Sequence, residues 1–187
     1  MSKELKQHSD KTMKIINTEK SDLPFVYHLF DEAILYQKKK NYPVWVGYDK
    51  TVLDNDVEYK RAFKIVINDK IACIFSITTY DMAWKDDGLG IAVYVHRLVV
   101  NPKYKGQKLF GKVTNWLVDY AKEHQMKLVR MDTWGNNPSI IDYYKTFGFE
   151  LIGFQQYPNT EDIPIQMRGN RSALLEYRIN GQWTIDN

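Results

Sequence analysis

The sequence contains little cysteine, no long apolar run and little net charge. Its one cysteine, Cys73, excludes an intrachain disulfide framework and a cysteine-rich zinc site. We expect Cys73 to be buried, because it lies in the apolar run at 71–75. No apolar run reaches the length of a membrane-spanning helix, and residues 1–14 are polar and charged, unlike a secretory signal. We therefore expect a cytoplasmic protein that is not bound to a membrane.

The net charge and the histidine content exclude two further classes of protein. A net charge of +3 over 187 residues argues against nucleic-acid binding, because such proteins usually carry a clustered basic face. The four histidines and the single cysteine show no metal-ligand spacing, so we expect no metal. Hydrophobic residues make up 44% of the chain and aromatic residues 14%, which predicts a packed core.

The order of predicted elements indicates an α+β fold. We expect residues 1–11 to form a flexible tail and residues 12–187 to form a single domain. Strands are predicted at 12–17, 63–67, 71–80, 91–100, 127–134, 149–157 and 173–179, and helices at 21–34, 53–62, 109–124 and 138–146. A tight turn at 68–70 joins the second and third strands. This order mixes antiparallel hairpins with strand–helix units, which is typical of the α+β class.

The segment from residue 95 to residue 111 carries the strongest functional signal. A β-branched strand ends at Asn101 and Pro102, a short basic turn contains Gly106, and an amphipathic helix follows. Backbone N–H groups at the start of a helix lack partners inside the helix and lie at the positive end of its dipole. The segment therefore predicts a site for an anion such as phosphate.

Two motifs resemble those of the GNAT superfamily of coenzyme A-dependent N-acetyltransferases. Residues 98–110, LVVNPKYKGQKLF, are similar to its strand and phosphate loop. Residues 137–149, NPSIIDYYKTFGF, match its Asn, its Tyr seven positions later and its Gly-Phe. The resemblance covers about residues 12 to 180. It implies a mixed, mostly antiparallel central sheet with helices on both faces, splayed between the fourth and fifth strands.

The resemblance also implies acetyl-CoA as cosubstrate and assigns residues to it. Backbone groups of Leu98, Val99 and Val100 would pair with the pantetheine arm as an added strand would. The alternative, an ordinary buried strand, fits the same residues. Lys105 takes the family's Arg/Gln position, and Asn137 would contact the coenzyme as well as cap its helix. The expected diphosphate donors are the amides of Gly106, Gln107, Lys108, Leu109, Phe110 and Gly111.

The phosphate loop departs from the family pattern at two positions. Lys108 and Phe110 stand where the family has small residues that allow a close backbone approach. We expect both to donate nonetheless, because N–H groups in a first helical turn need no positive φ. Lys108 would add a cation, and Gly111 would allow the close approach one residue later. Coenzyme binding is therefore expected to survive.

Two residues are expected to carry the chemistry. Tyr144 matches the family's tyrosine that protonates the leaving thiolate, and it would also contact the coenzyme, whereas Tyr143 points elsewhere on the helix. His96 lies two residues before Leu98, on the same predicted strand face, where some members carry a glutamate as base. Imidazole suits a base because its pKa lies near neutrality. For both residues a packing role is the alternative, and a water chain could replace the base.

The acceptor site is less well defined by the sequence. Glu58 and Asp81 are weaker candidates for the base, because exposed surface positions are favoured for both. Aromatic residues could enclose a cationic amine by ring-face attraction, or could simply form the core. The candidates are Tyr42, Trp45, Tyr48, Tyr80, Trp84, Trp134 and Tyr157.

The predicted function is transfer of an acetyl group from acetyl-CoA to a primary amine of a small molecule or a protein. One alternative is a GNAT-like module that binds an acyl-CoA without catalysis. A second is a nucleotide-binding P-loop at 106–114, GQKLFGKVT, although Val113 stands where that motif needs Ser or Thr. The sequence leaves the acceptor, the acyl chain length and the oligomeric state open, a homodimer included.

Overall fold

The computed structural model describes residues 12–40, 47–84, 90–163 and 167–179. The strands are β1 (Met13–Asn17), β2 (Ala62–Ile67), β3 (Lys70–Thr78), β4 (Ala92–Val100), β5 (Leu128–Trp134), β6 (Glu150–Gln156) and β7 (Arg171–Arg178). The helices are α1 (Leu23–Lys39), α2 (Lys50–Glu58), α3 (Leu109–Glu123) and α4 (Pro138–Lys145), with 3-10 turns η1 (Lys20–Asp22) and η2 (Pro102–Tyr104). The predicted tail at 1–11 lies outside the described residues.

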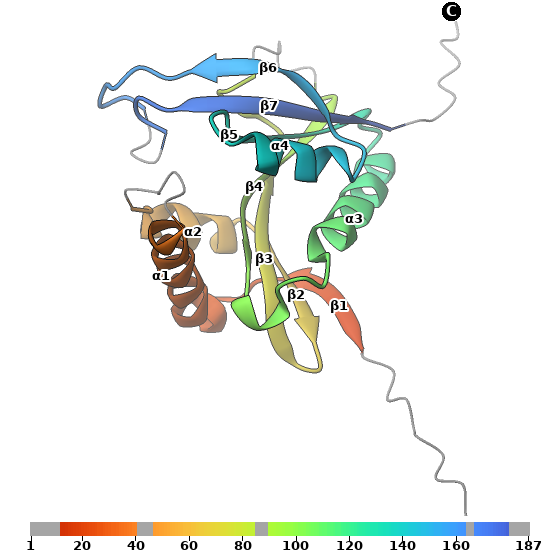
Figure 1. Ribbon diagram of the computed structural model, residues 1–187. Helices are drawn as coiled ribbons and strands as arrows, with labels where there is room; N and C mark the ends of the chain where they lie inside the picture. The colour runs from red at the N-terminus through yellow and green to blue at the C-terminus, as the bar shows by residue number, and fades with distance from the viewer. Residues whose placement is uncertain (1–11, 41–46, 85–89, 164–166, 180–187) are drawn as a thin grey trace, which may run out of the picture.

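The strands form one sheet in the order β1-β2-β3-β4-β5-β7-β6 (Figure 1). Every neighbouring pair is antiparallel except β4 and β5, which are parallel. The tight turn between β2 and β3 uses Asn68 and Asp69, both with positive φ, as a type I′ hairpin requires. The mixed, mostly antiparallel sheet predicted from the sequence is confirmed.

Helices cover both faces of this sheet, as predicted. On one face α1 and α2 pack their apolar residues, such as Leu29, Phe30 and Leu53, against Ile74 and Val99. On the other face α3 and α4 join the largest core cluster, which includes the residues Cys73, Phe75, Val93, Val95, Phe110, Val113, Leu117 and Ile141. Figure 1 shows α1 and α2 together on one side of the central strands and α3 on the other. Cys73 is fully buried, as expected, and burial raises the pKa of its thiol to about 12.

A β-bulge in β4 changes which face its residues occupy. Between the pairs Ser76↔His96 and Ile74↔Val99, β4 has one residue more than β3. Arg97 is this extra residue and has a φ of +51°. Its guanidinium pairs with the buried Asp56 of α2. Leu98 and Val100 therefore pack with Val95 on the α3 side. The prediction that His96 and Leu98 share a face is wrong, because the bulge reverses the alternation.

Two helix starts differ from the prediction. Helix α2 begins at Lys50 rather than near Leu53, because the Asp49 carboxylate accepts a hydrogen bond from the Thr51 N–H (2.8 Å). Ala62, expected at the end of this helix, opens β2 instead. The first helix, predicted from residue 21, begins at Leu23, and Pro24 lies in its first turn. The Asp22 side chain forms no cap for α1, and accepts from the Glu19 N–H (2.7 Å) around η1.

Candidate active site

Strands β4 and β5 part after three residue pairs and form a fork. The last pair is Tyr94↔Arg130, and both strands continue, to Val100 and Trp134, without pairing with each other. On its other edge β4 stays paired with β3 as far as Val100. The splay predicted between the fourth and fifth strands is confirmed. It leaves the β5-side edge of β4 at residues 98–100 open to an extended ligand.

The predicted anion turn lies directly after this open edge. Pro102–Tyr104 form η2, Gly106 takes a φ of +84°, and α3 begins at Leu109. Lys108 is the N-cap of α3 and has a φ of +52°, in the left-handed region. The expectation that no positive φ is needed is therefore wrong for Lys108. Its backbone adopts the conformation for which the family uses glycine, and its side chain is exposed.

Not all of the six predicted amides are available to an anion. The Gln107 N–H donates to the Tyr104 carbonyl (3.3 Å), and the Gly111 N–H donates to the Lys108 carbonyl (3.0 Å). Across 102–123, which the structure describes without a gap, no backbone bond uses the N–H groups of Gly106, Lys108, Leu109 or Phe110. Lys108, Leu109 and Phe110 carry orphan donors of the helix start, and Gly106 adds a fourth orphan N–H from the turn before it.

Phe110 and Gly111 both pack toward the core. Phe110 is 2% exposed and points into the core, where its ring lies 4.7 Å from that of Tyr144. A Cβ at Gly111 would come within 3.0 Å of the Phe147 ring, so the glycine permits close packing of α3. The predicted close approach of Gly111 to phosphate has no support here. Because Gly111 lies inside α3, its place does not support a P-loop either.

Lys105 connects the anion turn to α1. Its Nζ donates to the Tyr36 hydroxyl (2.6 Å) and lies 4.4 Å from the centre of that ring. This hydrogen bond and the positive charge of Lys105 lower the pKa of Tyr36. Lys105, which precedes Gly106 in the chain, thus links the turn to α1.

The φ of Lys108 makes a testable prediction about stability. We expect Lys108→Gly to leave the free energy of unfolding unchanged or to raise it by up to about 1 kcal/mol, because glycine removes the left-handed strain but adds unfolded-state entropy. Lys108→Val should lower it by about 1–2 kcal/mol, since a β-branched residue tolerates this region poorly. Urea unfolding of the three proteins measures both changes. A loss of stability in Lys108→Gly would contradict the assignment.

Tyr144 lies on α4 beside the fork. Its ring packs against Phe110, and burial, with the nearby Tyr143 and Asp132, raises the pKa of its hydroxyl. The hydroxyl therefore stays protonated at neutral pH, which is the state a proton donor needs. Tyr143, its neighbour, is 40% exposed and packs on Phe147.

Asn137 caps α4, as predicted. Its side-chain oxygen accepts from the Ile140 N–H (3.3 Å), and its own N–H donates to the Trp134 carbonyl at the end of β5. The helix that carries Tyr144 is thereby anchored where β5 leaves the fork. The side-chain amide of Asn137 keeps its N–H donors for another contact.

The hydrogen bonds around His96 fix the position of its proton. The Thr78 hydroxyl donates to the Tyr80 carbonyl (2.7 Å), and Thr78 Oγ1 also lies 2.8 Å from His96 Nε2. A hydroxyl has one hydrogen to donate, so His96 Nε2–H must donate to Thr78. Nδ1 is then the ring nitrogen with a free lone pair. Burial, together with the charge of Arg97, lowers the pKa of His96 from 6.5 to about 3, which favours this neutral form.

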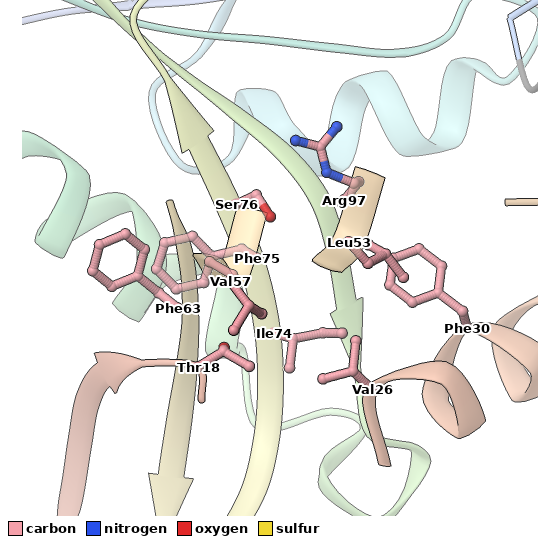
Figure 2. Close-up of a pocket in the computed structure, with 11 residues that line it drawn as sticks. Thr18, Val26, Phe30, Leu53, Val57, Phe63, Ile74, Phe75, Ser76 and Arg97 are labelled. Carbon is pink, nitrogen blue, oxygen red and sulfur yellow. The ribbon is translucent and has the colours of Figure 1, made fainter. Parts of the chain in front are cut away.

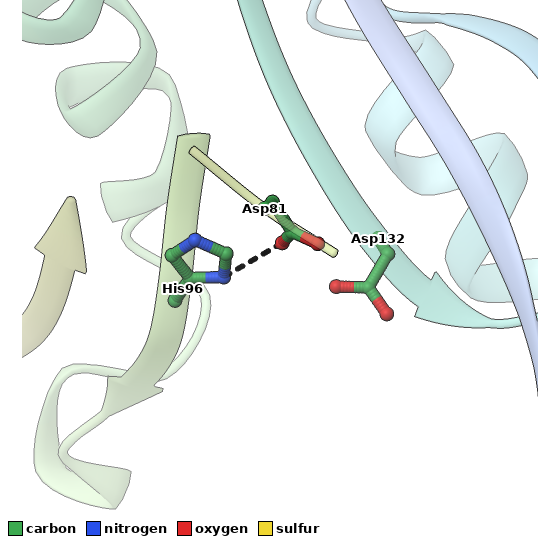
Figure 3. Close-up of side chains that lie close together, drawn as sticks. All are labelled: Asp81, His96 and Asp132. Atoms are coloured by element: carbon green, nitrogen blue, oxygen red, sulfur yellow. Dashed lines mark ion pairs between the residues drawn. The ribbon is translucent and has the colours of Figure 1, made fainter. Parts of the chain in front are cut away.

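Two carboxyl groups lie beside this lone pair. Asp81 follows β3 and places Oδ2 3.5 Å from His96 Nδ1, and Asp132 lies on β5 (Figure 3). One ligand atom from each of the three side chains falls within 4.8 Å of the other two. Burial raises the pKa of Asp132, although the hydrogen bond that its carboxylate accepts from the Ser172 hydroxyl (2.8 Å) acts in the opposite direction. Burial thus shifts both His96 and Asp132 toward their neutral forms.

The remaining sequence candidates have mixed outcomes. Asp81 is buried, so its predicted exposed position is wrong, whereas Glu58 is exposed and pairs with Lys20. Trp84 and Tyr157 are buried together with Tyr94 on the His96 side of the sheet. Tyr80 is exposed, and the Tyr48 hydroxyl donates to Asp31 (3.0 Å). Tyr42 and Trp45 lie outside the described residues.

A small apolar cavity of about 20 Å³ lies between α1, α2 and β3 (Figure 2). Its lining includes Phe30, Leu53 and Ile74, and Arg97 lies at one side. The Thr18 hydroxyl, also in this lining, has no hydrogen-bond partner among the described residues. The cavity is large enough for about one water molecule, so it is not a coenzyme site.

Comparisons with known proteins agree with this geometry. Residues 25–149 match the model of the acetyltransferase (GNAT) family. The uncharacterized N-acetyltransferase YesJ of Bacillus subtilis is 29% identical over 112 residues, which are 57% of this chain and 62% of that protein. The chain thus spans about three fifths of the length of this relative.

Solved structures show the same fold at lower identity. A GNAT-family acetyltransferase of Listeria monocytogenes superposes with a TM-score of 0.69 at 18% identity, over 89% of this chain and 94% of that one. The Salmonella typhimurium protein yncA, whose structure contains its cofactor acetyl-CoA, gives a TM-score of 0.64 at 16% identity. That alignment covers 93% of this chain and 98% of yncA.

Proposed function

The chain belongs to the GNAT family of acetyltransferases, and from this premise we propose that it transfers an acetyl group from acetyl-CoA to a primary amine. One observation carries the proposal. The open edge of β4 runs directly into a turn whose N–H groups at Gly106 and Lys108–Phe110 have no backbone partner in the described part of the chain. An extended arm that ends in a diphosphate matches an open strand edge followed by a helix start.

In this proposal the coenzyme lies along β4 and ends at α3. The pantetheine arm pairs with the backbone of residues 98–100, and the diphosphate accepts from the four orphan amides. Lys105 and Lys108 add positive charge beside these amides. The thioester then lies near the fork, between Tyr144 of α4 and His96 of β4. Asn137 offers its side-chain amide to the same arm.

The two proposed catalytic residues move protons in opposite directions. His96 Nδ1 accepts one proton from the acceptor ammonium, which frees the nitrogen lone pair. That lone pair attacks the thioester carbonyl carbon, the N–C bond forms, and the C–S bond breaks. Tyr144 gives its proton to the leaving thiolate, and the second proton that the nitrogen loses restores the Tyr144 hydroxyl through solvent, while His96 releases the first. The products are the N-acetyl amine, CoA and one released proton.

The lowered pKa of His96 makes a prediction about pH. Because His96 stays neutral until the pH approaches 3, its base form is present throughout the range between about pH 5 and pH 8. We therefore expect kcat to show no inflection near 6.5. His96→Gln should lower kcat about 10- to 100-fold without changing the KM for acetyl-CoA. The pH profiles of both enzymes check this. An inflection near 6.5 that disappears in His96→Gln would show that imidazole titrates in the usual range.

A module that binds acyl-CoA without catalysis remains the alternative, motivated by the bulky residues in the phosphate loop. A panel of primary amines, with thiol release from acetyl-CoA as the readout, separates the two functions. The proposed enzyme releases CoA in proportion to one or more amines. Binding of acetyl-CoA without thiol release for any amine would support the module instead.

A further inference from the structure

The mechanism proposed above gives no role to the carboxyl groups of Asp81 and Asp132 at the fork. Tyr94 and Arg130 form the last pair of β4 and β5, and Arg130 Nη1 donates to the Tyr94 hydroxyl (3.0 Å) on one face of the sheet. Two residues further along each strand, on the same face, lie His96 and Asp132. Asp81 completes the group from the segment after β3 (Figure 3). The cluster therefore lies at the point where the fork opens.

This cluster concentrates acidic groups in a largely buried place. The His96 side chain is 15% exposed and that of Asp81 is 7% exposed, while Asp132 is half-buried. The arginines of these two strands pair elsewhere, Arg97 with Asp56 and Arg130 with Glu176. Buried carboxylates are favoured when a cation or a donor approaches them. The chemistry of the cluster thus suits a positively charged ligand.

A second and independent observation points to a ligand at this place. Tyr157, directly after β6, is 3% exposed, and its hydroxyl has no hydrogen-bond partner within the described residues. Burial raises the pKa of this hydroxyl, and the charges of Asp132 and Asp81 raise it further, so the hydroxyl lies in the field of both. A buried hydroxyl without a partner is unfavourable unless a ligand supplies one.

We propose that Asp81, Asp132 and Tyr157 bind the acceptor amine as a primary alkylammonium ion at the opening of the fork. The proposal rests on the proposed acetyl transfer and names its substrate class. A primary ammonium has three N–H donors and no acceptor. Two carboxyl oxygens and one hydroxyl oxygen provide three acceptors for them. His96 Nδ1 lies beside Asp81 and accepts the proton that leaves before attack.

The proton transfer fits the same surroundings. When the ammonium gives a proton to His96 Nδ1, the positive charge passes to the imidazole ring and stays beside Asp81 and Asp132, whose carboxylates stabilise it. A divalent cation could also contact the three side chains shown in Figure 3. An ion there would coordinate the amine lone pair and hold it away from the thioester. We therefore assign the cluster to the ammonium.

The test uses n-butylamine, protonated at neutral pH, as the probe of the CoA-saturated protein. Butan-1-ol and tetramethylammonium chloride are the comparators, because one lacks the charge and the other lacks N–H donors. Thermal melting over a range of probe concentrations gives the apparent Kd. We expect butylammonium to bind more tightly than either comparator. Asp132→Asn should weaken it at least about tenfold. Asp119→Asn, an exposed change on α3, should have no effect.

Tyr157→Phe separates a loss of binding from a loss of stability. The variant removes a hydroxyl that has no described partner, so the melting temperature without probe should stay equal or rise. The same variant should weaken butylammonium binding about three- to tenfold. Unchanged affinity in both Tyr157→Phe and Asp132→Asn would overturn the proposal.

Two further outcomes would also overturn it. One is equal stabilisation by butylammonium and tetramethylammonium. The other is binding of Zn²⁺ that Asp132→Asn abolishes, with no response to butylammonium in either the free or the CoA-saturated protein. Failure of the wild-type protein to bind CoA would refute the proposed acetyl transfer instead. CoA binding without selective ammonium binding would refute the acceptor subsite alone.

Discussion

Tyr144→Phe should lower kcat for acetyl transfer about 100-fold or more and leave the affinity for acetyl-CoA unchanged. The change removes one oxygen from a ring that packs against Phe110 and leaves that packing in place. Because burial and Asp132 raise the pKa of the hydroxyl, it is protonated when the thioester bond breaks. Without it the thiolate must leave unprotonated or take a proton from water. Steady-state kinetics and a calorimetric titration with acetyl-CoA measure the two quantities separately.

Tyr143→Phe is the matched control for this experiment. It makes the same chemical change one residue away, on a ring that is 40% exposed and packs on Phe147. We expect near wild-type kcat for this variant. Equal losses in both variants would mean that the tyrosines act through packing. Full activity of Tyr144→Phe would remove Tyr144 from the mechanism.

Asp56→Ala should lower the free energy of unfolding by about 2–4 kcal/mol. Asp56 is 1% exposed, and its carboxylate accepts from Arg97 Nε (2.7 Å) and pairs with Arg61 (3.2 Å). Removal of the carboxylate leaves the guanidinium of Arg97 beside α2 without its partner. The expected loss lies below that for a fully buried pair, because both arginines are partly exposed. Chemical denaturation measures the change.

The same substitution should also weaken coenzyme binding. Arg97 is the extra residue of the bulge, and the bulge sets the face on which Leu98 and Val100, at the open edge of β4, pack. Asn55→Ala, an exposed change on the same helix, is the control and should alter neither quantity. A stable Asp56→Ala variant with wild-type affinity for acetyl-CoA would show that the ion pair does not hold the bulge.

Much of the fold could be predicted because its signals are local. The apolar runs of β2 and β3, the turn at Asn68 and Asp69, and the apolar stripe of α3 are each readable within a few residues. The bulge at Arg97 was not predictable, since the ion-pair partner of Arg97, Asp56, lies forty-one positions earlier in the chain. Its consequence for the face of Leu98 was missed for the same reason.

The candidate site divides in the same way. The anion turn and the tyrosine of α4 belong to contiguous motifs, so both could be located from the sequence. Asp132 could not be identified from the sequence, because a single aspartate in a strand forms no motif with the residues near it in the chain. Its meeting with His96 and Asp81 requires the parallel register of β4 and β5. At Lys108 the sequence was misleading in another way. A lysine in place of the family's glycine suggested a different backbone, but Lys108 adopts the left-handed conformation that glycine favours.

A calorimetric titration with acetyl-CoA, repeated in the presence of excess Mg²⁺–ATP, tests the central claim most directly. The fork and the start of α3 should bind acetyl-CoA at a single saturable site with a Kd between about 1 μM and 1 mM. Mg²⁺–ATP should compete weakly or not at all. No measurable association with acetyl-CoA, or its full displacement by Mg²⁺–ATP, would contradict the account.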